Sequence, residues 1–306
     1  MFAVQYSRFG PPDVLTVGPH PEPHPGPGQV RIRVRAAGVS PVDLSLRAGR
    51  SPAGKSLALP HIPGVDAAGV IDELGAEAGA AVGDEVFGSV DISRLGGASA
   101  EFAVLATWAV KPASMSWDEA GAAGTSVETA TRALDLLDVR AGHTLLIDAA
   151  AGGVGSVAVQ LAIARGARVI GTARAESHTF VEQLGAIPIT YGPGLTERLS
   201  TLGHVDLALH IAGDTLPELI AITGSAASVV TIADFNGPAL GVRLSLGEFG
   251  GQPNGRHGLA LAAELSSAGR FHVPVQQAFP MKQAAAAHTA AANGARRGKI
   301  VIQTLP

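Results

Sequence analysis

Strands and helices alternate regularly through the middle of the chain. Short apolar runs that suit buried strands lie at 144–147, 168–171, 187–190, 205–211 and 227–232. Segments of helical period separate them, at 154–165, 176–184, 195–201 and 215–222. This alternation predicts a doubly wound parallel sheet, preceded by an alanine-rich helix over 117–137.

The two ends of the chain have a different pattern. Near the N-terminus, short alternating runs separated by Gly and Pro lie at 30–36, 67–73, 85–90 and 100–106. Their spacing predicts a small antiparallel barrel or sandwich. After a loop at 234–256, the pattern predicts a helix (257–268), a strand (272–277), a helix (281–292) and a strand (299–303). The last two elements are candidates to rejoin the first domain.

The turn after the first buried strand, at 149–155, consists almost entirely of small residues. Ala150, Gly152 and Gly155 give AxGxxG, which differs from the GxGxxG fingerprint of dinucleotide-binding turns by one alanine. The N–H groups at a helix start are unpaired and the helix dipole is positive there, so a diphosphate can bind the main chain alone. A turn that merely links strand to helix is the alternative. The flanking strand, helix and second strand favour dinucleotide binding.

Composition favours small-molecule chemistry. Of the 306 residues, 46% are hydrophobic and 16% charged, and the net charge is -4, so neither a nucleic-acid partner nor a disordered chain is expected. Cysteine is absent, which excludes disulfides, a thiolate nucleophile and cysteine-ligated metals. The N-terminus lacks a signal-peptide pattern, and no apolar stretch reaches the roughly 18 residues of a membrane span. We expect an unprocessed, cytoplasmic protein without a membrane partner.

An ordered set of motifs resembles the zinc-independent quinone oxidoreductases of the medium-chain dehydrogenase/reductase superfamily. The motifs are AAGVSPVDLSLRAG (36–49), LPHIPGVDAAGVI (59–71), GDEVFG (83–88), AEF (100–102), TATRAL (129–134), AAAGGVGSVAVQLA (149–162), GARVIGTA (166–173), LGA (184–186) and RRGKIVI (296–302). The resemblance implies an α/β fold with a GroES-like β-barrel catalytic domain and a Rossmann domain. It places the first part of the catalytic domain at 1–115, the NADP-binding Rossmann domain at 116–256, and a return segment completing both domains at 257–306.

The resemblance also bears on metal binding. In the zinc alcohol dehydrogenases of this superfamily a catalytic cysteine stands at the position of Ser40, and a GHE triplet stands where this chain has Gly64, Val65 and Asp66. Serine is a poor zinc ligand and valine cannot ligate, so we expect no metal. Without a Lewis acid, the expected acceptor is one whose own conjugation spreads the incoming charge, such as a quinone or an enone.

Ser40 and Asp43 are the candidate catalytic residues, because they are the nearest polar side chains expected on the acceptor side. Many relatives carry a tyrosine in the segment that here reads RSPAGKSLALP (50–60), so the proton donor is not identified. Asp43 has an alternative role as a cap of the following helix. We interpret Arg296, Arg297 and Lys299 as a solvated basic edge, and Asp66 as an acid with no metal to orient.

The end of the second parallel strand predicts the choice of cofactor. NAD enzymes usually place an acid there, whereas this chain has Thr172 and Ala173, followed by Arg174. Arg174 is a candidate for the 2′-phosphate, with a solvated loop arginine as the alternative. Other candidates for the adenosine end are Ser177, His178 and, by resemblance, Tyr191. The predicted cofactor is NADPH.

The remaining cofactor-binding candidates come from the turn and from the carboxyl edge of the sheet, where ligands collect, except that Thr129 and Phe249 are implied by the resemblance. They are Ala151, Gly152, Gly153, Val154, Thr129, Ile211, Ala212, Ile232, Ala233 and Phe249. Thr129 is instead a helix threonine bonding its own backbone in the alternative interpretation. His210 is expected to be a satisfied histidine at a strand end. Phe249 lies in GEFGGQPN (247–254), where Gly250 and Gly251 replace bulky family residues and suggest room for a polycyclic acceptor.

The predicted function is NADPH-dependent, metal-free hydride transfer to a quinone or to the C=C bond of an α,β-unsaturated carbonyl. The alternative is a non-catalytic NADPH-binding protein with a crystallin-like or sensor role. Dimerisation is common in the family that the chain resembles, so a homodimer is expected.

Overall fold

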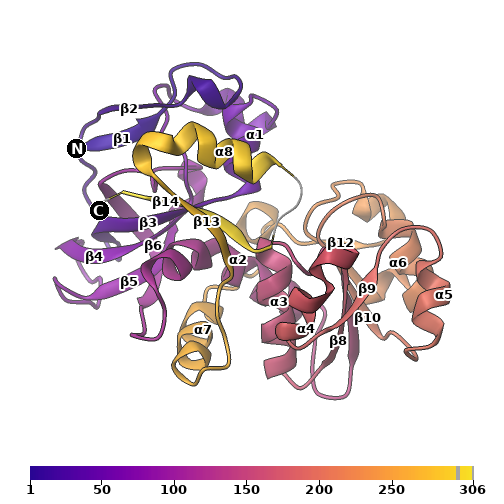
Figure 1. The fold of residues 1–306 in the computed structure, drawn as a ribbon. Coiled ribbons are helices and arrows are strands. Elements are labelled where there is room, and N and C mark those ends of the chain that lie inside the picture. The colour runs from indigo at the N-terminus through magenta and orange to yellow at the C-terminus, as the bar shows by residue number, and fades with distance from the viewer. Residues whose placement is uncertain (294–296, 305–306) are drawn as a thin grey trace. The chain divides into compact units, whose positions relative to one another are not determined.

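The computed structural model describes residues 1–293 and 297–304 (Figure 1). The chain forms two compact units. Unit 1 comprises Met1–Thr125 and Leu259–Pro306, and unit 2 comprises Ser126–Gly258. Helix α2 (Trp117–Leu136) therefore contributes residues to both units, and the described residues from Leu259 onward belong to unit 1.

Unit 1 is built on a six-stranded sheet with the order β13-β14-β3-β4-β5-β6. The strands are β3 (Val30–Val39), β4 (Asp66–Leu74), β5 (Glu85–Val90), β6 (Phe102–Val110), β13 (Val275–Pro280) and β14 (Lys299–Gln303). Strand β3 pairs antiparallel with β4, β6 and β14, so β3 to β6 close into a ring. The strand predicted at 272–277 lies three residues further along, as β13.

Alternating apolar side chains fill the interior of the β3–β6 ring. Val30, Ile32 and Val34 of β3 are fully buried there. Strand β5 crosses its neighbour at close range, because a Cβ added at Gly88 would lie 1.9 Å from the Thr107 carbonyl oxygen. The predicted barrel is thus confirmed, with glycine at a backbone contact that no side chain fits.

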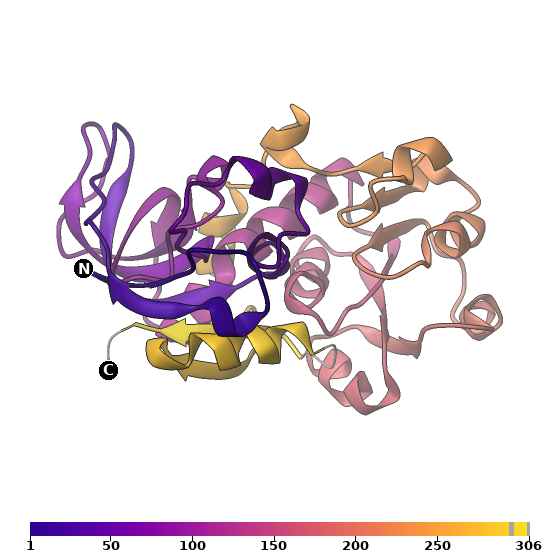
Figure 2. The ribbon, with the colours of Figure 1, turned by 90° about the horizontal axis from the view of Figure 1, so that it is seen from above.

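A second apolar cluster lies between the sheet and the terminal helices. Helix α8 (Ala284–Ala292) packs Ala287 and Ala291 against Ile300 and Ile302 of β14, and Figures 1 and 2 show it lying along this strand. The other strands and α-helices of this part of the chain are β1 (Phe2–Gln5), β2 (Thr16–Pro19), α1 (Pro41–Arg47) and α7 (Gly258–Ser267), of which β1 and α1 contribute Val4 and Leu44 to the cluster. The strand β1 and the helix α1 are too short to show a clear period in the sequence.

Unit 2 is a parallel six-stranded sheet with the order β12-β11-β10-β7-β8-β9. Its strands are β7 (Thr144–Ile147), β8 (Arg168–Ala173), β9 (Ile187–Thr190), β10 (Leu207–His210), β11 (Val229–Thr231) and β12 (Arg243–Leu244). Its helices are α3 (Gly153–Ala164), α4 (His178–Gln183), α5 (Leu195–Ser200) and α6 (Leu216–Thr223). The predicted doubly wound sheet is confirmed. The two-residue strand β12 lies within the loop predicted at 234–256.

Strand order reverses between β7 and β10, which are neighbours in the sheet. From this point the chain winds outward in both directions. The loops that follow β7 and β10 therefore leave the same edge of the sheet side by side, which is the place where ligands bind in open α/β sheets.

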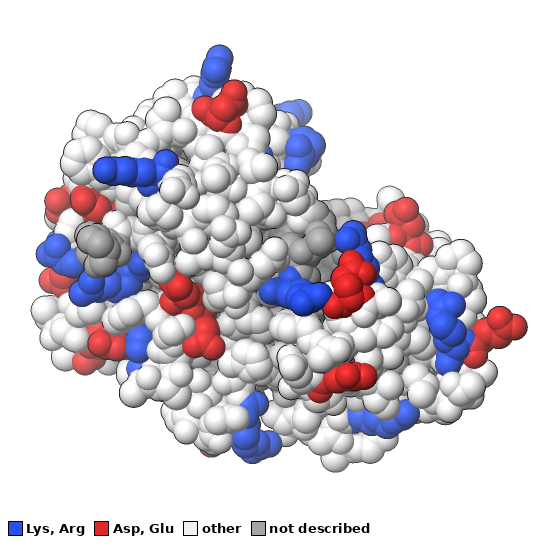
Figure 3. Space-filling view, viewed as in Figure 1, with Lys and Arg blue, Asp and Glu red and all other residues white. Residues whose placement is uncertain are grey.

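Only 16% of the residues are charged. On the face shown in Figure 3, acidic and basic side chains lie interspersed on a mostly uncharged surface. Within the described ranges, no helix combines the length and the apolar character needed to cross a membrane.

Candidate active site

The turn between β7 and α3 is packed so tightly that it needs small residues. A Cβ on Gly155 would lie 2.3 Å from the Ala149 carbonyl oxygen, so the helix approaches the turn only with glycine there. Ala149 itself has a φ of 52°, in the left-handed region. Ala150 takes the place of a glycine because Gly171 on β8 leaves room: a Cβ added at Gly171 would lie 2.6 Å from that of Ala150.

The start of α3 remains accessible. Gly152 is the N-cap residue, and Gly152, Gly153 and Val154 are half-buried, whereas Ala151 is buried. The first N–H groups of a helix have no partner within it. Together with the positive end of the helix dipole, they suit an anionic diphosphate.

Asp148, which follows β7 directly, holds this turn in place. Its side chain is buried and accepts hydrogen bonds from the Ala149 N–H (2.9 Å), the Thr172 hydroxyl (2.7 Å) and the Thr215 hydroxyl (3.0 Å). Thr172, a candidate for cofactor binding, therefore turns its hydroxyl toward Asp148. Sequence reasoning missed Asp148, although an acid directly after a buried strand was a usable signal.

The end of β8 brings together two of the adenosine-end candidates. Arg174 is exposed, and its Nε donates to the Tyr191 hydroxyl at 3.4 Å. One Arg174 guanidinium nitrogen also lies 3.9 Å from the Glu176 carboxylate. His178 is half-buried with Nε2 3.4 Å from the Thr190 hydroxyl, and Ser177 and Ala173 are buried.

The loops that follow β10 and β11 carry Ile211, Ala212, Ile232 and Ala233 along the same edge of the sheet. His210 ties these loops together. Its Nε2 donates to the Gly213 carbonyl at 3.1 Å, and its Nδ1 lies 2.8 Å from the Thr231 hydroxyl. The Thr231 hydroxyl also accepts the Ala233 N–H at 3.2 Å. His210 is the satisfied strand-end histidine that was expected.

Thr129 lies on α2, and its hydroxyl binds neighbouring side chains rather than its own backbone. It donates to the Glu128 carboxylate at 3.2 Å and accepts from Arg132 at 3.4 Å. Glu128 and Arg132 in turn bind the Gly255 N–H and the Ser245 hydroxyl, which fastens the segment carrying Phe249. Phe249 lies in a short 3₁₀ helix, Gly247–Gly250, with 61% of its surface exposed.

In unit 1, Ser40 and Asp43 lie at the start of α1. Ser40 is the N-cap residue, and the buried Asp43 carboxylate accepts the Ser40 N–H at 2.8 Å and the Gly64 N–H at 3.0 Å. Burial raises the pKa of Asp43 to about 7, although both amides favour its ionised form. Both carboxylate oxygens thus bind backbone, as in the capping role considered for this residue.

Ser40 belongs to a buried polar cluster that includes Lys299 and Asp66. The Lys299 ammonium donates to the Ser40 hydroxyl at 2.7 Å and to the Asp66 carboxylate at 3.1 Å. The expectation of a solvated basic edge is wrong for Lys299, because strand register buries it. Ile300 pairs with Val39 and Gly38 with Asp66, so the three side chains meet at the ends of β14, β3 and β4. Arg297 is exposed, and Arg296 lies outside the described residues.

Thr125 of α2 completes this cluster, and sequence reasoning missed it. Its hydroxyl donates to the Asp66 carboxylate at 2.8 Å, and its backbone N–H donates to the other carboxylate oxygen. The helix approaches Asp66 closely because a Cβ at Gly124 would lie 2.8 Å from this second oxygen. Asp66 thus organises three elements without any exposure to solvent.

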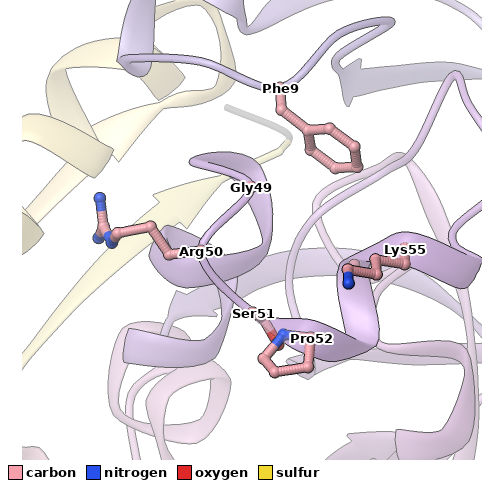
Figure 4. A pocket seen from close by; sticks show the side chains of 7 residues that line it. Phe9, Gly49, Arg50, Ser51, Pro52 and Lys55 are labelled. Carbon is pink, nitrogen blue, oxygen red and sulfur yellow. The ribbon is translucent and has the colours of Figure 1, made fainter.

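The segment where family members often have a tyrosine lines a hollow of about 200 Å³ beside the end of α1. Figure 4 shows the Phe9 ring at one side of this hollow and Pro52 and Lys55 at the other, while the side chain of Arg50 points away from them. The hollow is open to solvent and belongs to unit 1.

Two family models match the chain. The alcohol dehydrogenase GroES-like domain matches residues 26–115, within unit 1, and the zinc-binding dehydrogenase model matches residues 184–302. The chain belongs to the medium-chain dehydrogenase/reductase superfamily. The predicted resemblance is confirmed at this level.

Similar members of the superfamily include reductases of conjugated carbonyl compounds. A quinone oxidoreductase of Pongo abelii is 40% identical over 58% of this chain and 54% of its own length. A 2-methylene-furan-3-one reductase of Solanum lycopersicum is 34% identical over 60% of this chain and 45% of its own. The matches span about half the length of these curated relatives. The structure of a quinone oxidoreductase from Coxiella burnetii has a TM-score of 0.87 and 28% identity, covering 100% of this chain and 99% of that one.

The zinc that the name of the second family model implies does not fit this superfamily member. The place between Ser40 and Asp66 is taken by the Lys299 ammonium, a cation that excludes a second one at hydrogen-bond distance. Among the described residues, no three His, Cys, Asp or Glu side chains gather as a metal site would require. Ser40, Asp66 and Lys299 therefore form a hydrogen-bonded ion pair and not a metal site.

A nicotinamide dinucleotide, in contrast, fits the residues of unit 2. Gly155 lets α3 start close beneath the turn, and the helix start is accessible. Arg174 follows the next strand, β8, and contacts Tyr191, which follows β9. These are the features that a diphosphate and an adenosine ribose need in this sheet topology.

Proposed function

We propose that this chain is an NADPH-dependent reductase that transfers a hydride to a quinone or to the C=C bond of an α,β-unsaturated carbonyl. The observation that carries the proposal is the edge of unit 2, where an accessible helix start lies beside a strand that ends in Ala173 and Arg174 instead of an acid. When bound, the nicotinamide supplies the hydride.

The cofactor is proposed to contact main chain and small side chains along this edge. The turn and the start of α3 hold the diphosphate, and Arg174 with Tyr191 binds the 2′-phosphate and the adenosine. The nicotinamide half lies along the residues that follow β10 and β11, together with Thr129 and Phe249. Asp148 and His210 act by fixing the loops that these contacts need.

The acceptor class is inferred from the hydrogen-bonding side chains of unit 1 and from similar proteins. Ser40 is proposed to donate a hydrogen bond to the acceptor oxygen, on which negative charge grows as hydride arrives. Asp43 fixes the backbone of Ser40. A plant relative that is 35% identical is named NADPH-dependent alkenal/one oxidoreductase, which supports both the cofactor and the acceptor class.

A bulky, polycyclic acceptor remains part of the proposal. Gly250 and Gly251 carry no side chains beside the exposed Phe249. The hollow beyond α1 begins about 10 Å along the helix from Ser40, so it offers space for the far end of a large acceptor. The homodimer and the cytoplasmic location remain predictions, and sedimentation of the purified protein tests the first.

The test is a steady-state assay of NADPH and NADH oxidation with a one-ring quinone, a fused-ring quinone and a linear enone. We expect turnover with NADPH, faster with the fused-ring than with the one-ring quinone. Tight NADPH binding without turnover of any acceptor would favour the non-catalytic alternative. Equal efficiency with NADH would remove the cofactor assignment.

A further inference from the structure

The Lys299 ammonium is buried, with 6% of its side chain exposed, and contacts one charged and one neutral oxygen. Burying an ammonium is costly unless it is paired and hydrogen-bonded. Asp66 supplies the opposite charge at 3.1 Å. The shorter of the two contacts, however, is the 2.7 Å bond to the Ser40 hydroxyl, which charge pairing alone does not require.

The Asp66 carboxylate has no free lone pair with which to accept a strong hydrogen bond from Ser40. The oxygen nearest to Ser40 already accepts from the Thr125 hydroxyl at 2.8 Å and from Lys299 at 3.1 Å, which fills its two lone pairs. Ser40 lies 3.3 Å from the same oxygen, which is long for a hydroxyl donor. The Ser40 oxygen is thus held by Lys299, while the Ser40 hydroxyl donates only the long 3.3 Å bond to Asp66 within this cluster.

We propose that Lys299 is a positioning residue for Ser40. By donating to the Ser40 oxygen, the ammonium orients the hydroxyl proton away from the cluster, and its positive charge strengthens that hydroxyl as a donor. This inference rests on the proposed function, in which Ser40 contacts the acceptor oxygen.

Lys299 acts through the Ser40 hydroxyl while negative charge develops on the acceptor oxygen. Hydride adds with its electron pair to the conjugated carbon, and the π electrons move to the acceptor oxygen, which becomes negative. The Ser40 hydroxyl donates to that oxygen, and the product then takes its proton from water. Lys299 keeps its proton throughout, so no further reactant is needed.

The test is a double-mutant cycle that keeps the cluster neutral. Lys299→Met alone would leave a buried carboxylate without its cation, which endangers folding. Asp66→Asn with Lys299→Met removes both charges, and the new amide can accept the Thr125 N–H with its oxygen and donate to the Thr125 hydroxyl with its NH2 group. Ser40→Ala is made in the wild type and in this double variant. Thr125→Val is a third background, because it frees a lone pair of Asp66 for the Ser40 proton while Lys299 stays in place.

We expect Ser40→Ala to lower kcat about 100-fold in the wild type but less than about tenfold in the double variant, because Ser40 has by then lost the support of Lys299. KM for NADPH should stay the same in both, and Thr125→Val should also reduce the Ser40 effect, because the Ser40 proton can then turn to the freed lone pair of Asp66. An equal loss in both backgrounds would overturn the proposal, since Lys299 would then be purely structural.

A second measurement needs no turnover. The visible spectrum of bound 4-nitrophenol reports the fraction ionised, so it measures how well the site stabilises a negative oxygen. The ionised fraction should fall in Ser40→Ala and in the double variant to the same extent, and unchanged ionisation in the double variant would refute the inference. If the wild type reduces no acceptor, the proposed function fails, while the nitrophenol titration still tests Lys299.

Discussion

At the scale of single residues, three buried aspartates shape the chain around the candidate site. Asp148 accepts the Ala149 N–H, Asp43 accepts the N–H groups of Ser40 and Gly64, and Asp66 accepts the N–H of Thr125. Each carboxylate thus fixes a backbone segment that also carries a proposed contact. Leaving such a buried amide without an acceptor costs about 1–3 kcal/mol, so these residues contribute to stability and to the geometry of the site together.

Arg174 offers the most direct test of cofactor choice. Arg174→Ala should raise KM for NADPH by about tenfold or more, because a charge-assisted bond to the 2′-phosphate is lost, and should leave KM for NADH unchanged. The measurement is a pair of saturation curves. Arg140→Ala is the control, because Arg140 is exposed in the loop before β7, at the opposite edge of the sheet. An equal effect of both substitutions would indicate general electrostatics instead of a specific contact.

At the scale of elements, the match between Ala150 and Gly171 makes the unusual turn possible. Gly171→Ala should destabilise the protein by about 1–3 kcal/mol, because the new methyl group overlaps the Ala150 Cβ and crowds Val181. Adding Ala150→Gly should recover part of this loss, since one of the two overlaps is removed. Urea denaturation measures both. No recovery in the double variant would show that the two residues are not coupled.

The elements predicted well from the sequence are those whose own side chains fix them. The strand β7 and the helix α3 have apolar runs of the right length and period, and both lie within a residue of their predicted limits. The strand β12 lacks such a signal, because it has two residues and only one side of it pairs with the sheet. A local pattern cannot indicate it.

The site was predictable where it depends on neighbours in the sequence. The glycine turn and Arg174 follow from motif and position. The role of Lys299 does not, because it arises from the register of β14 on β3, which brings together residues 259 positions apart. Thr125 contacts Asp66 for a similar reason, through helix packing that no spacing in the chain reveals.

At the scale of the whole molecule, two buried groups give stability opposing dependences on pH. Burial lowers the pKa of His288 from 6.5 to about 4, with a smaller effect of Arg47. The unfolded chain therefore binds more protons between these values, and stability rises with pH there. The pKa of Asp43 is raised from 3.8 to about 7, so the folded chain binds more protons and stability falls as pH rises through that window.

His288→Leu should remove the rise of stability with pH, so that the fall caused by Asp43 becomes visible. Near pH 5 the variant should gain about 2 kcal/mol relative to its change near pH 8, because the folded protein no longer resists protonation of a buried ring. Urea denaturation at the two pH values gives the difference. His204→Leu, at an exposed histidine of unit 2, is the control. A variant whose stability changes equally at both pH values would contradict the assigned pKa.

The late position of Lys299 in the chain also sets an order of assembly. Unit 2 is one continuous segment, whereas unit 1 needs strand β14 from the far end of the chain. During synthesis, Asp66 therefore lacks the Lys299 ammonium until all of unit 2 has been made. The cluster around Ser40 forms last. Pulse-labelled hydrogen exchange during refolding should show β7 and β8 protected before β14. The proposed acceptor contact at Ser40 is therefore assembled after the turn and strands that are proposed to bind the cofactor.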